Sequence, residues 1–145
     1  MIDYIYEWAR QRSSFKAKIE ERVKIISSHL VLIMWAKIYD PGNRNIIHWK
    51  GELIGFCGDL ALLKMENNKY SKRKKVFEDV FYGTCEVNTA GGLYAESYKK
   101  LREEGITDRI ESMKACEKAV IAMINLVDMM ARKEVENIEN YIELL

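Results

Sequence analysis

Proline is almost absent from this chain, and glycine is scarce. One Pro and eight Gly among 145 residues leave few helix breakers, which argues against a turn-rich β architecture and favours helices. A strong charge of either sign is also lacking, because 23 Lys and Arg nearly balance 22 Asp and Glu and give a net charge of +1. This balance argues against a dedicated nucleic-acid binder, although a local basic patch stays open.

Cysteine is sparse and its spacing carries no motif. Cys57, Cys85 and Cys116 are far apart and form no Cys-x-x-Cys pair, so neither a zinc knuckle nor a thioredoxin-type motif is indicated. Free thiols suit a reducing cytoplasm. The first residues show no basic leader before an apolar core, and the apolar run 30–35 is too short to cross a bilayer. We therefore expect a cytoplasmic protein without a membrane segment.

The apolar residues recur at helical spacing along most of the chain. The spacing predicts helices over about 2–39, 45–65, 72–82, 92–104 and 108–145, the first with a possible break at Ser13 and Ser14. A length of 145 residues is typical of one domain, so we expect residues 1–145 to form a single domain. Because the connections are short, we expect an all-α, mostly antiparallel bundle of about four to five helices with a long C-terminal helix. Residues 83–92 are interpreted as a loop, with a short strand as the alternative.

The last predicted helix contains no Gly or Pro from Asp108 onward. Two stripes at a spacing of three and four mark apolar faces of a helix: Ile110, Met113, Cys116, Val120, Met123, Val127 and Met130, then Ala131, Val135, Ile138, Ile142 and Leu145. Asp108 and Glu111 resemble a capping box at the start of this helix, and Gly105 suits the end of the preceding one. Since apolar residues continue to the end of the sequence, we expect another subunit or the bundle itself to cover them.

Three glycines share one side of the second predicted helix. Gly51, Gly55 and Gly58 follow each other at four and three residues. Small residues on one side allow another backbone to come close, and each glycine weakens the helix by about 0.8–1 kcal/mol relative to alanine. The sequence therefore predicts that close packing holds this segment in shape.

The only histidines, His29 and His48, are the basis of a metal hypothesis. If the first two helices pack together, His29, His48, Glu52 and Asp59 could converge, and mixed His/carboxylate clusters hold metals in helical bundles. No Glu-x-x-His or His-Glu-x-x-His motif is present. A hydrogen-bonded structural histidine is the simpler interpretation, so no metal or other cofactor is predicted.

The segment Arg44-Asn45-Ile46-Ile47-His48 resembles the Arg-Asn-x-x-x-His motif of the HEPN superfamily of small helical domains, which includes ribonucleases and toxins. The resemblance implies RNA cleavage or binding by Arg44 and His48 across a dimer. Here the spacer is one residue shorter than the usual minimum, which changes the relative direction of the two side chains on a helix.

A longer resemblance covers residues 20–56. His29-Leu30, Trp35, the Tyr39-Asp40-Pro41 turn and Trp49 follow the order of features in the DUF29 family, which is prokaryotic, helical and of unassigned function. The resemblance implies two helices joined by a turn and no particular chemistry.

The most basic stretch starts the third predicted helix. Lys72, Arg73, Lys74 and Lys75 follow Lys69 and Tyr70. Such a cluster can contact phosphates with salt-dependent affinity, but it is also a common solvated helix surface. Cations at this end oppose the helix dipole.

These patterns favour a non-enzymatic helical protein that binds protein, as a homo-oligomer, over an enzyme. We expect the interface to use Val127, Met130, Val135, Ile138 and Ile142. A HEPN-like activity is the alternative, and a nucleic-acid partner for the basic stretch is a third.

Overall fold

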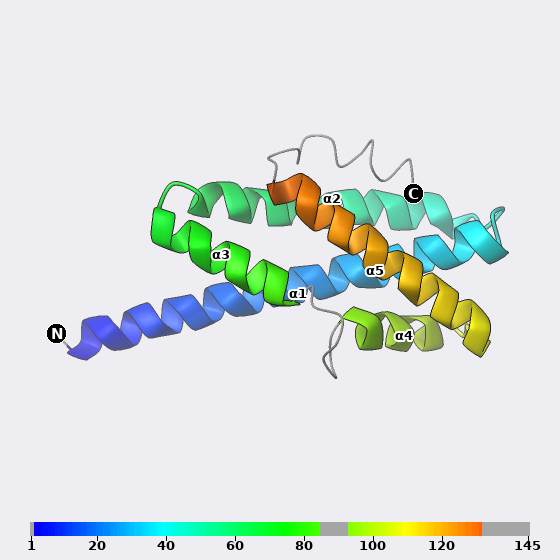
Figure 1. The fold of residues 1–145 in the computed structure, drawn as a ribbon, viewed down its shortest axis with the longest axis horizontal. Helices are drawn as coiled ribbons and strands as arrows, with labels where there is room; N and C mark the ends of the chain where they lie inside the picture. The colour runs from blue at the N-terminus through cyan, green and yellow to red at the C-terminus, as the bar shows by residue number, and fades with distance from the viewer. Residues whose placement is uncertain (1, 85–92, 132–145) are drawn as a thin grey trace.

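In the computed structural model of the chain, five helices form the bundle drawn in Figure 1: α1 (Ile2–Tyr39), α2 (Asn45–Asn67), α3 (Ser71–Thr84), α4 (Leu93–Glu103) and α5 (Arg109–Ala131). The structure describes residues 2–84 and 93–131, and side chains within 15–83 and 95–129. Every regular element in these ranges is a helix, which confirms the all-α bundle. The prediction for residues 83–92 lies largely outside the described residues, and so does the part of the last predicted helix beyond Ala131.

The long helix α1 is the axis of the bundle. It packs against each of the other four helices, and α2 and α5 run in the direction opposite to α1 (Figure 1). Its predicted stripe is confirmed, because Ile19, Val23, Ile26, Leu30 and Ile33 are all buried. The segment 30–34 is buried on every side, as expected for a helix that passes through the centre of a core.

The predicted break at Ser13 and Ser14 is wrong. The helix α1 continues through both residues. Serine is a weak helix former because its hydroxyl competes for backbone groups, but it can also bond back to the preceding turn, as the Ser28 hydroxyl does to the Lys24 carbonyl at 2.9 Å.

Local signals fix the helix ends. The backbone N–H groups of Gly105 and Ile106 donate to the carbonyls of Arg102 and Leu101, both at 3.0 Å, and Gly105 has φ +81°. This is the Schellman arrangement, in which glycine takes the left-handed conformation. The Asp108 carboxylate accepts from the Glu111 backbone N–H at 2.8 Å and caps α5. Both ends lie where the sequence predicted them.

All five helices contribute to one core. On α2 the buried residues are Leu53, Cys57, Leu60, Ala61 and Lys64, and on α3 they include Phe77 and Phe81, which stack with ring centroids 5.7 Å apart. Two interior hydrogen bonds join α1 to its neighbours. The hydroxyls of Ser27 and Ser97 are 2.9 Å apart, and Trp35 Nε1 donates to Glu111 at 3.2 Å.

The expected close packing of the α2 glycines within the chain is wrong. Gly51, Gly55 and Gly58 are exposed, and no described residue comes within 4 Å of a Cβ placed on any of them. The apolar stripe of α2 faces α1 instead, and the glycines lie on the opposite side.

Two residues of the predicted α5 stripe are also misassigned. Ile110 and Met113 are 66% and 40% exposed, whereas Ala115, Cys116, Ala119, Met123 and Leu126 are buried. The buried side of α5 therefore does not include Ile110 and Met113, which lie on a neighbouring side of the helix. No helix among the described residues is long and apolar enough to cross a membrane.

Candidate functional site

The structure brings together the two histidines and one of the carboxylates that the sequence singled out. His29 Nε2 lies 2.5 Å from Glu52 Oε2, and His48 Nε2 lies 2.9 Å from Glu52 Oε1. His29 comes from α1, while His48 and Glu52 are one turn apart on α2. Asp59 is exposed two turns further along α2, too far along the helix to reach the same point.

Both ring nitrogens of His29 have a hydrogen-bond partner. Its Nδ1 lies 2.9 Å from the Ile25 carbonyl oxygen, which can only accept, so Nδ1 carries a hydrogen. The other ring nitrogen, Nε2, faces the Glu52 carboxylate at 2.5 Å. The hydrogen bond from His29 is the main cause of the lowered pKa of Glu52, and the charges of His48 and His29 lower it further.

This cluster joins two helices and is partly covered. The His29 side chain is 13% exposed and packs on Phe56, with ring centroids 5.2 Å apart. The more open His48 is 69% exposed. Within the described ranges, no group of three or more His, Cys, Asp or Glu residues could hold a metal ion. Through the contact between His29 and Glu52, the cluster forms a polar connection between α1 and α2.

Arg44 and His48 do not share a described contact. Arg44 is at the N-cap of α2 and makes no capping hydrogen bond with its side chain, and both residues are exposed. His48 bonds to Glu52 on its own helix. The HEPN-like activity stays a prediction.

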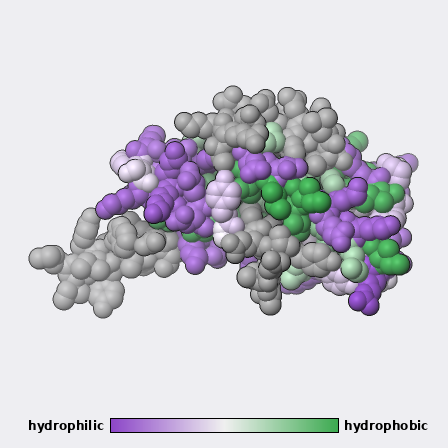
Figure 2. Space-filling model, in the orientation of Figure 1, coloured by the Kyte–Doolittle hydropathy of each residue, from purple (hydrophilic) through white to green (hydrophobic). Residues whose placement is uncertain are grey.

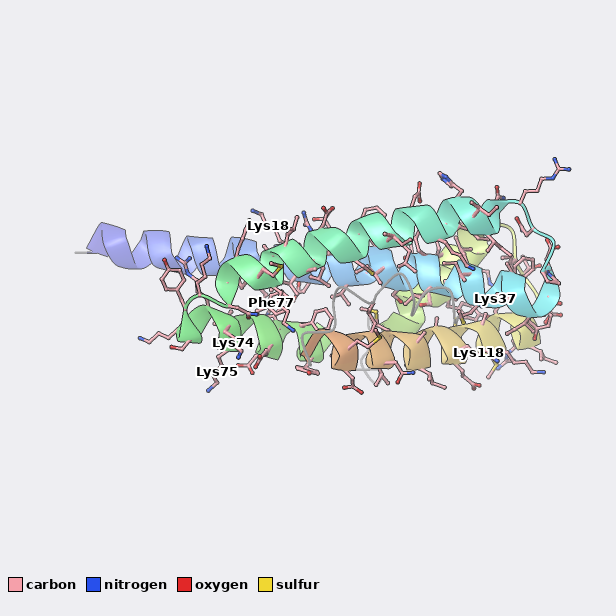
Figure 3. The ribbon with its side chains drawn as sticks, turned by 90° about the horizontal axis from the view of Figure 1, so that it is seen from above. Lys18, Lys37, Lys74, Lys75, Phe77 and Lys118 are labelled. Atoms are coloured by element: carbon pink, nitrogen blue, oxygen red, sulfur yellow. The ribbon has the colours of Figure 1, made fainter. Side chains whose placement is uncertain are left out.

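The basic stretch is a solvated helix surface. Lys72, Arg73, Lys74 and Lys75 are all exposed at the start of α3, whose first turn has no acidic residue. Figure 3 shows Lys74 and Lys75 directed away from the bundle, whereas Phe77 lies on its inner side. The Arg73 guanidinium lies over the exposed Tyr70 ring, 4.9 Å from its centroid. Polyanion binding by this stretch stays a prediction.

The predicted interface on α5 needs a correction. Val127 is 3% exposed and belongs to the core cluster, so it cannot contact a partner while the bundle is folded. The side chain of Met130 is not described, and Val135, Ile138 and Ile142 lie outside the described residues.

A different apolar face of α5 is open. The exposed fractions are 66% for Ile110, 40% for Met113, 59% for Ile121 and 44% for Ile124. These residues fall within a sector of about 80° at 100° per residue, which we call the α5 outer face. Glu117 and Asp128 share this sector and are exposed. Figure 2 shows hydrophobic surface in the middle of the visible face, over the position of α5 in Figure 1.

The sequence contained a signal for this face. Ile121 and Ile124 follow Ile110 by eleven and fourteen residues, which is about three and about four helical turns. The same register reaches Ala131, Val135 and Ile138 in the sequence. Two adjacent apolar sectors therefore overlap on one helix. Only the packing of α1 and α4 against α5 shows which sector is core.

Comparisons with known proteins identify no relative. No family model, no curated protein and no solved structure matches this chain. The resemblance of residues 20–56 to the DUF29 family stays a prediction.

Proposed function

We propose that this protein acts by binding protein, and that copies of the chain associate through the α5 outer face. The observation that carries the proposal is the exposure of Ile110, Met113, Ile121 and Ile124 along one side of a 23-residue helix. Single exposed apolar residues are ordinary, but a contiguous apolar surface rimmed by polar residues marks an interaction site.

The surroundings of the face fit an interface between helices. Exposed polar residues border it, including Lys114, Lys118 and Asn125, and Figure 3 shows Lys118 at the edge of the bundle. Apolar residues with a polar rim are the usual anatomy of protein interfaces, and here the exposed Glu117 divides the apolar residues of the face into two pairs, Ile110 with Met113 and Ile121 with Ile124. The two acidic residues within the sector, Glu117 and Asp128, can restrict how two such helices align, as polar residues do in coiled-coil seams.

Self-association is the favoured form of binding because the apolar register does not end with the described part of α5. In the sequence, Ile121, Ile124, Ala131, Val135 and Ile138 occupy positions of a three-and-four heptad seam, in which Asp128 takes the one polar position between Ile124 and Ala131. A seam of this kind requires a second helix of similar character, and an identical chain supplies one.

Light scattering after size exclusion tests the proposal. The double variant Ile121→Asp/Ile124→Asp is expected to lower the mass of the particle while the helical circular dichroism is retained, because both side chains are exposed in the single chain. The matched control is Ala17→Asp/Ala95→Asp, which places the same charges at exposed helical positions on α1 and α4. An unchanged mass in the Ile121/Ile124 variant would reject the α5 interface.

A further inference from the structure

The basic stretch at the start of α3 has no role in the proposed function. Five of the 23 Lys and Arg of the chain lie within residues 69–75, and this segment contains no Asp or Glu. The small net charge of +1 therefore results from positive and negative charges that lie in different parts of the chain. A local excess of charge, rather than the charge of the whole chain, determines whether a surface attracts a polyanion.

The charged side chains surround the first turn of α3. Residues 72–75 are all exposed, and four consecutive residues of an α-helix, at 100° each, point to all sides of its axis. Lys72 and Lys74 therefore extend in nearly opposite directions. The helix joins the core only from the next turn, where Phe77 is 2% exposed. In Figure 3, Lys74 and Lys75 are directed away from the bundle, so α3 begins as a projecting cationic turn.

The five cations of the basic stretch have no ion-pair partner among the side chains that the structure describes. Other lysines do have one, and these pairs are Lys16–Glu20, Lys24–Glu96, Lys100–Glu103 and Lys100–Glu104. The acidic residues nearest in sequence, Glu66, Glu78 and Asp79, pair with none of the five. Cations in the first turn also oppose the dipole of α3. Neither pairing among the described side chains nor helix stability accounts for them, whereas the phosphates of a binding partner would.

Arg73 and Tyr70 place two hydrogen-bond donors for phosphate side by side. The Arg73 guanidinium lies 4.9 Å from the centroid of the Tyr70 ring, and Tyr70 is 58% exposed. Arginine and tyrosine side chains both donate to phosphate oxygens in complexes with DNA, and a guanidinium that lies over an aromatic ring keeps its N–H groups at its edge. The ring therefore supports Arg73 without taking up its donors.

We infer that the first turn of α3 binds the phosphates of double-stranded DNA. The major groove of B-form DNA is about 12 Å wide and admits an α-helix, and phosphates line both of its walls. Cations on every side of the turn match this arrangement, because Lys72 and Lys74 can reach opposite walls. A membrane presents its charges on one side only, and the major groove of A-form RNA is deep and narrow. The inference goes beyond the proposed function and does not depend on α5.

Fluorescence anisotropy with a labelled DNA duplex of mixed sequence tests the inference. Each phosphate contact contributes about −0.9 to the slope of log K against log salt concentration. Contacts from all four residues 72–75 give a slope of about −3.6, so the affinity should fall about 10²-fold between about 50 and about 200 mM salt. Lys74→Ala/Lys75→Ala should bind more weakly and have a slope of about −1.8. Because alanine is the best helix former, thermal unfolding should show no loss of stability in this variant.

The matched control is Lys99→Ala/Arg109→Ala, which removes two exposed cations from α4 and α5 and changes the net charge equally. It should bind DNA like the wild type. Equal slopes for the wild type and Lys74→Ala/Lys75→Ala, or no DNA binding by the wild type at about 50 mM salt, would overturn the inference. An equal loss of affinity in the control would also overturn it, because the attraction would then follow the net charge.

Vesicles that contain phosphatidylserine are the competing probe. Tighter binding to these vesicles than to the duplex would assign the basic stretch to a membrane surface and overturn the inference. Light scattering of each protein without DNA shows the number of copies in the particle. A wild type that is a monomer and still binds DNA through α3 would reject the α5 interface and leave this inference standing.

Discussion

His29 and Glu52 join α1 to α2 through a contact of 2.5 Å between Nε2 and Oε2, and the Ile25 carbonyl fixes the hydrogen on the other ring nitrogen of His29. The titratable groups of this cluster are His29 on α1 and Glu52 and His48 on α2. This polar connection spans two helices that are 23 residues apart in sequence at the contact. The Glu52 carboxylate of this connection has a lowered pKa, mainly because of the hydrogen bond from His29.

Glu52→Gln should flatten the acid side of the stability profile. The hydrogen bond from His29 lowers the pKa of Glu52 in the folded protein below the ordinary value of a glutamate. A lowered carboxyl pKa stabilises the fold above the unfolded value, and this contribution is lost as the pH falls through the folded value. Urea unfolding across this range should show that the wild type loses more stability than the variant. Parallel profiles for the two proteins would contradict the pairing. Glu21→Gln, at an exposed position on α1, is the control.

The two buried serine hydroxyls should contribute to stability as a coupled pair. Removal of both should lower the free energy of unfolding by less than the sum of the two single removals. Ser27 and Ser97 are 1% and 0% exposed, and their hydroxyls bond to each other across α1 and α4. Ser27→Ala should lower the free energy of unfolding by about 1–3 kcal/mol because Ser97 loses its partner. Ser27→Ala/Ser97→Ala should be less destabilising than the sum of the single variants. Strict additivity in denaturant unfolding would show that the pair is not coupled. Ser28→Ala, which removes an exposed hydroxyl, should have little effect.

Asp108→Ala should destabilise the start of α5. The carboxylate accepts from the Glu111 backbone N–H at 2.8 Å, and loss of such a cap costs about 1 kcal/mol. Asp108→Ser keeps an acceptor and should retain most of the stability, while Thr107→Ala, one residue outside the cap, should change little. Equal midpoints in urea for Asp108→Ala and the wild type would argue against the cap.

The two described cysteines should be unreactive in the folded protein. Burial raises the pKa of Cys57 to about 12 and that of Cys116 to about 11, so almost no thiolate forms near neutral pH. In a Cys85→Ser background, modification by a thiol reagent should occur only at the rate of unfolding. Rapid labelling without denaturant would mean that one of these thiols is open to solvent.

The sequence predicted the positions of the helices better than it predicted which side of each helix is buried. Gly105, Asp108 and the Pro41-Gly42 turn act through local backbone chemistry, so their positions in the chain were enough to place helix ends. The α1 stripe was equally clear because a helix at the centre of a bundle buries most of its circumference. Ser13 and Ser14 were misjudged because the weak helix propensity of serine is easily overridden by the residues around it.

The choice between two apolar sectors could not be made from sequence. Val127 and Ile124 are both apolar and lie three residues apart, yet one is 3% and the other 44% exposed. Their difference depends on which side of α5 meets α1 and α4, a long-range property. The position of the α2 glycines could not be predicted from sequence either. Their small size suggested close packing, but whether they face α1 depends on how the two helices align, and the structure places them on the side away from α1. In the histidine cluster, the pairing of His48 with Glu52 could be predicted because the two residues are one helical turn apart on α2. The contact of His29 with Glu52 could not, because it depends on how α1 and α2 align along their lengths.

The mass of the wild-type protein in a dilution series, measured by light scattering, tests the central claim most directly. An α5 outer face that binds other copies predicts a particle heavier than the 17.0 kDa chain, with a mass that falls on dilution as the copies separate. A particle of 17.0 kDa at every concentration would contradict self-association through α5.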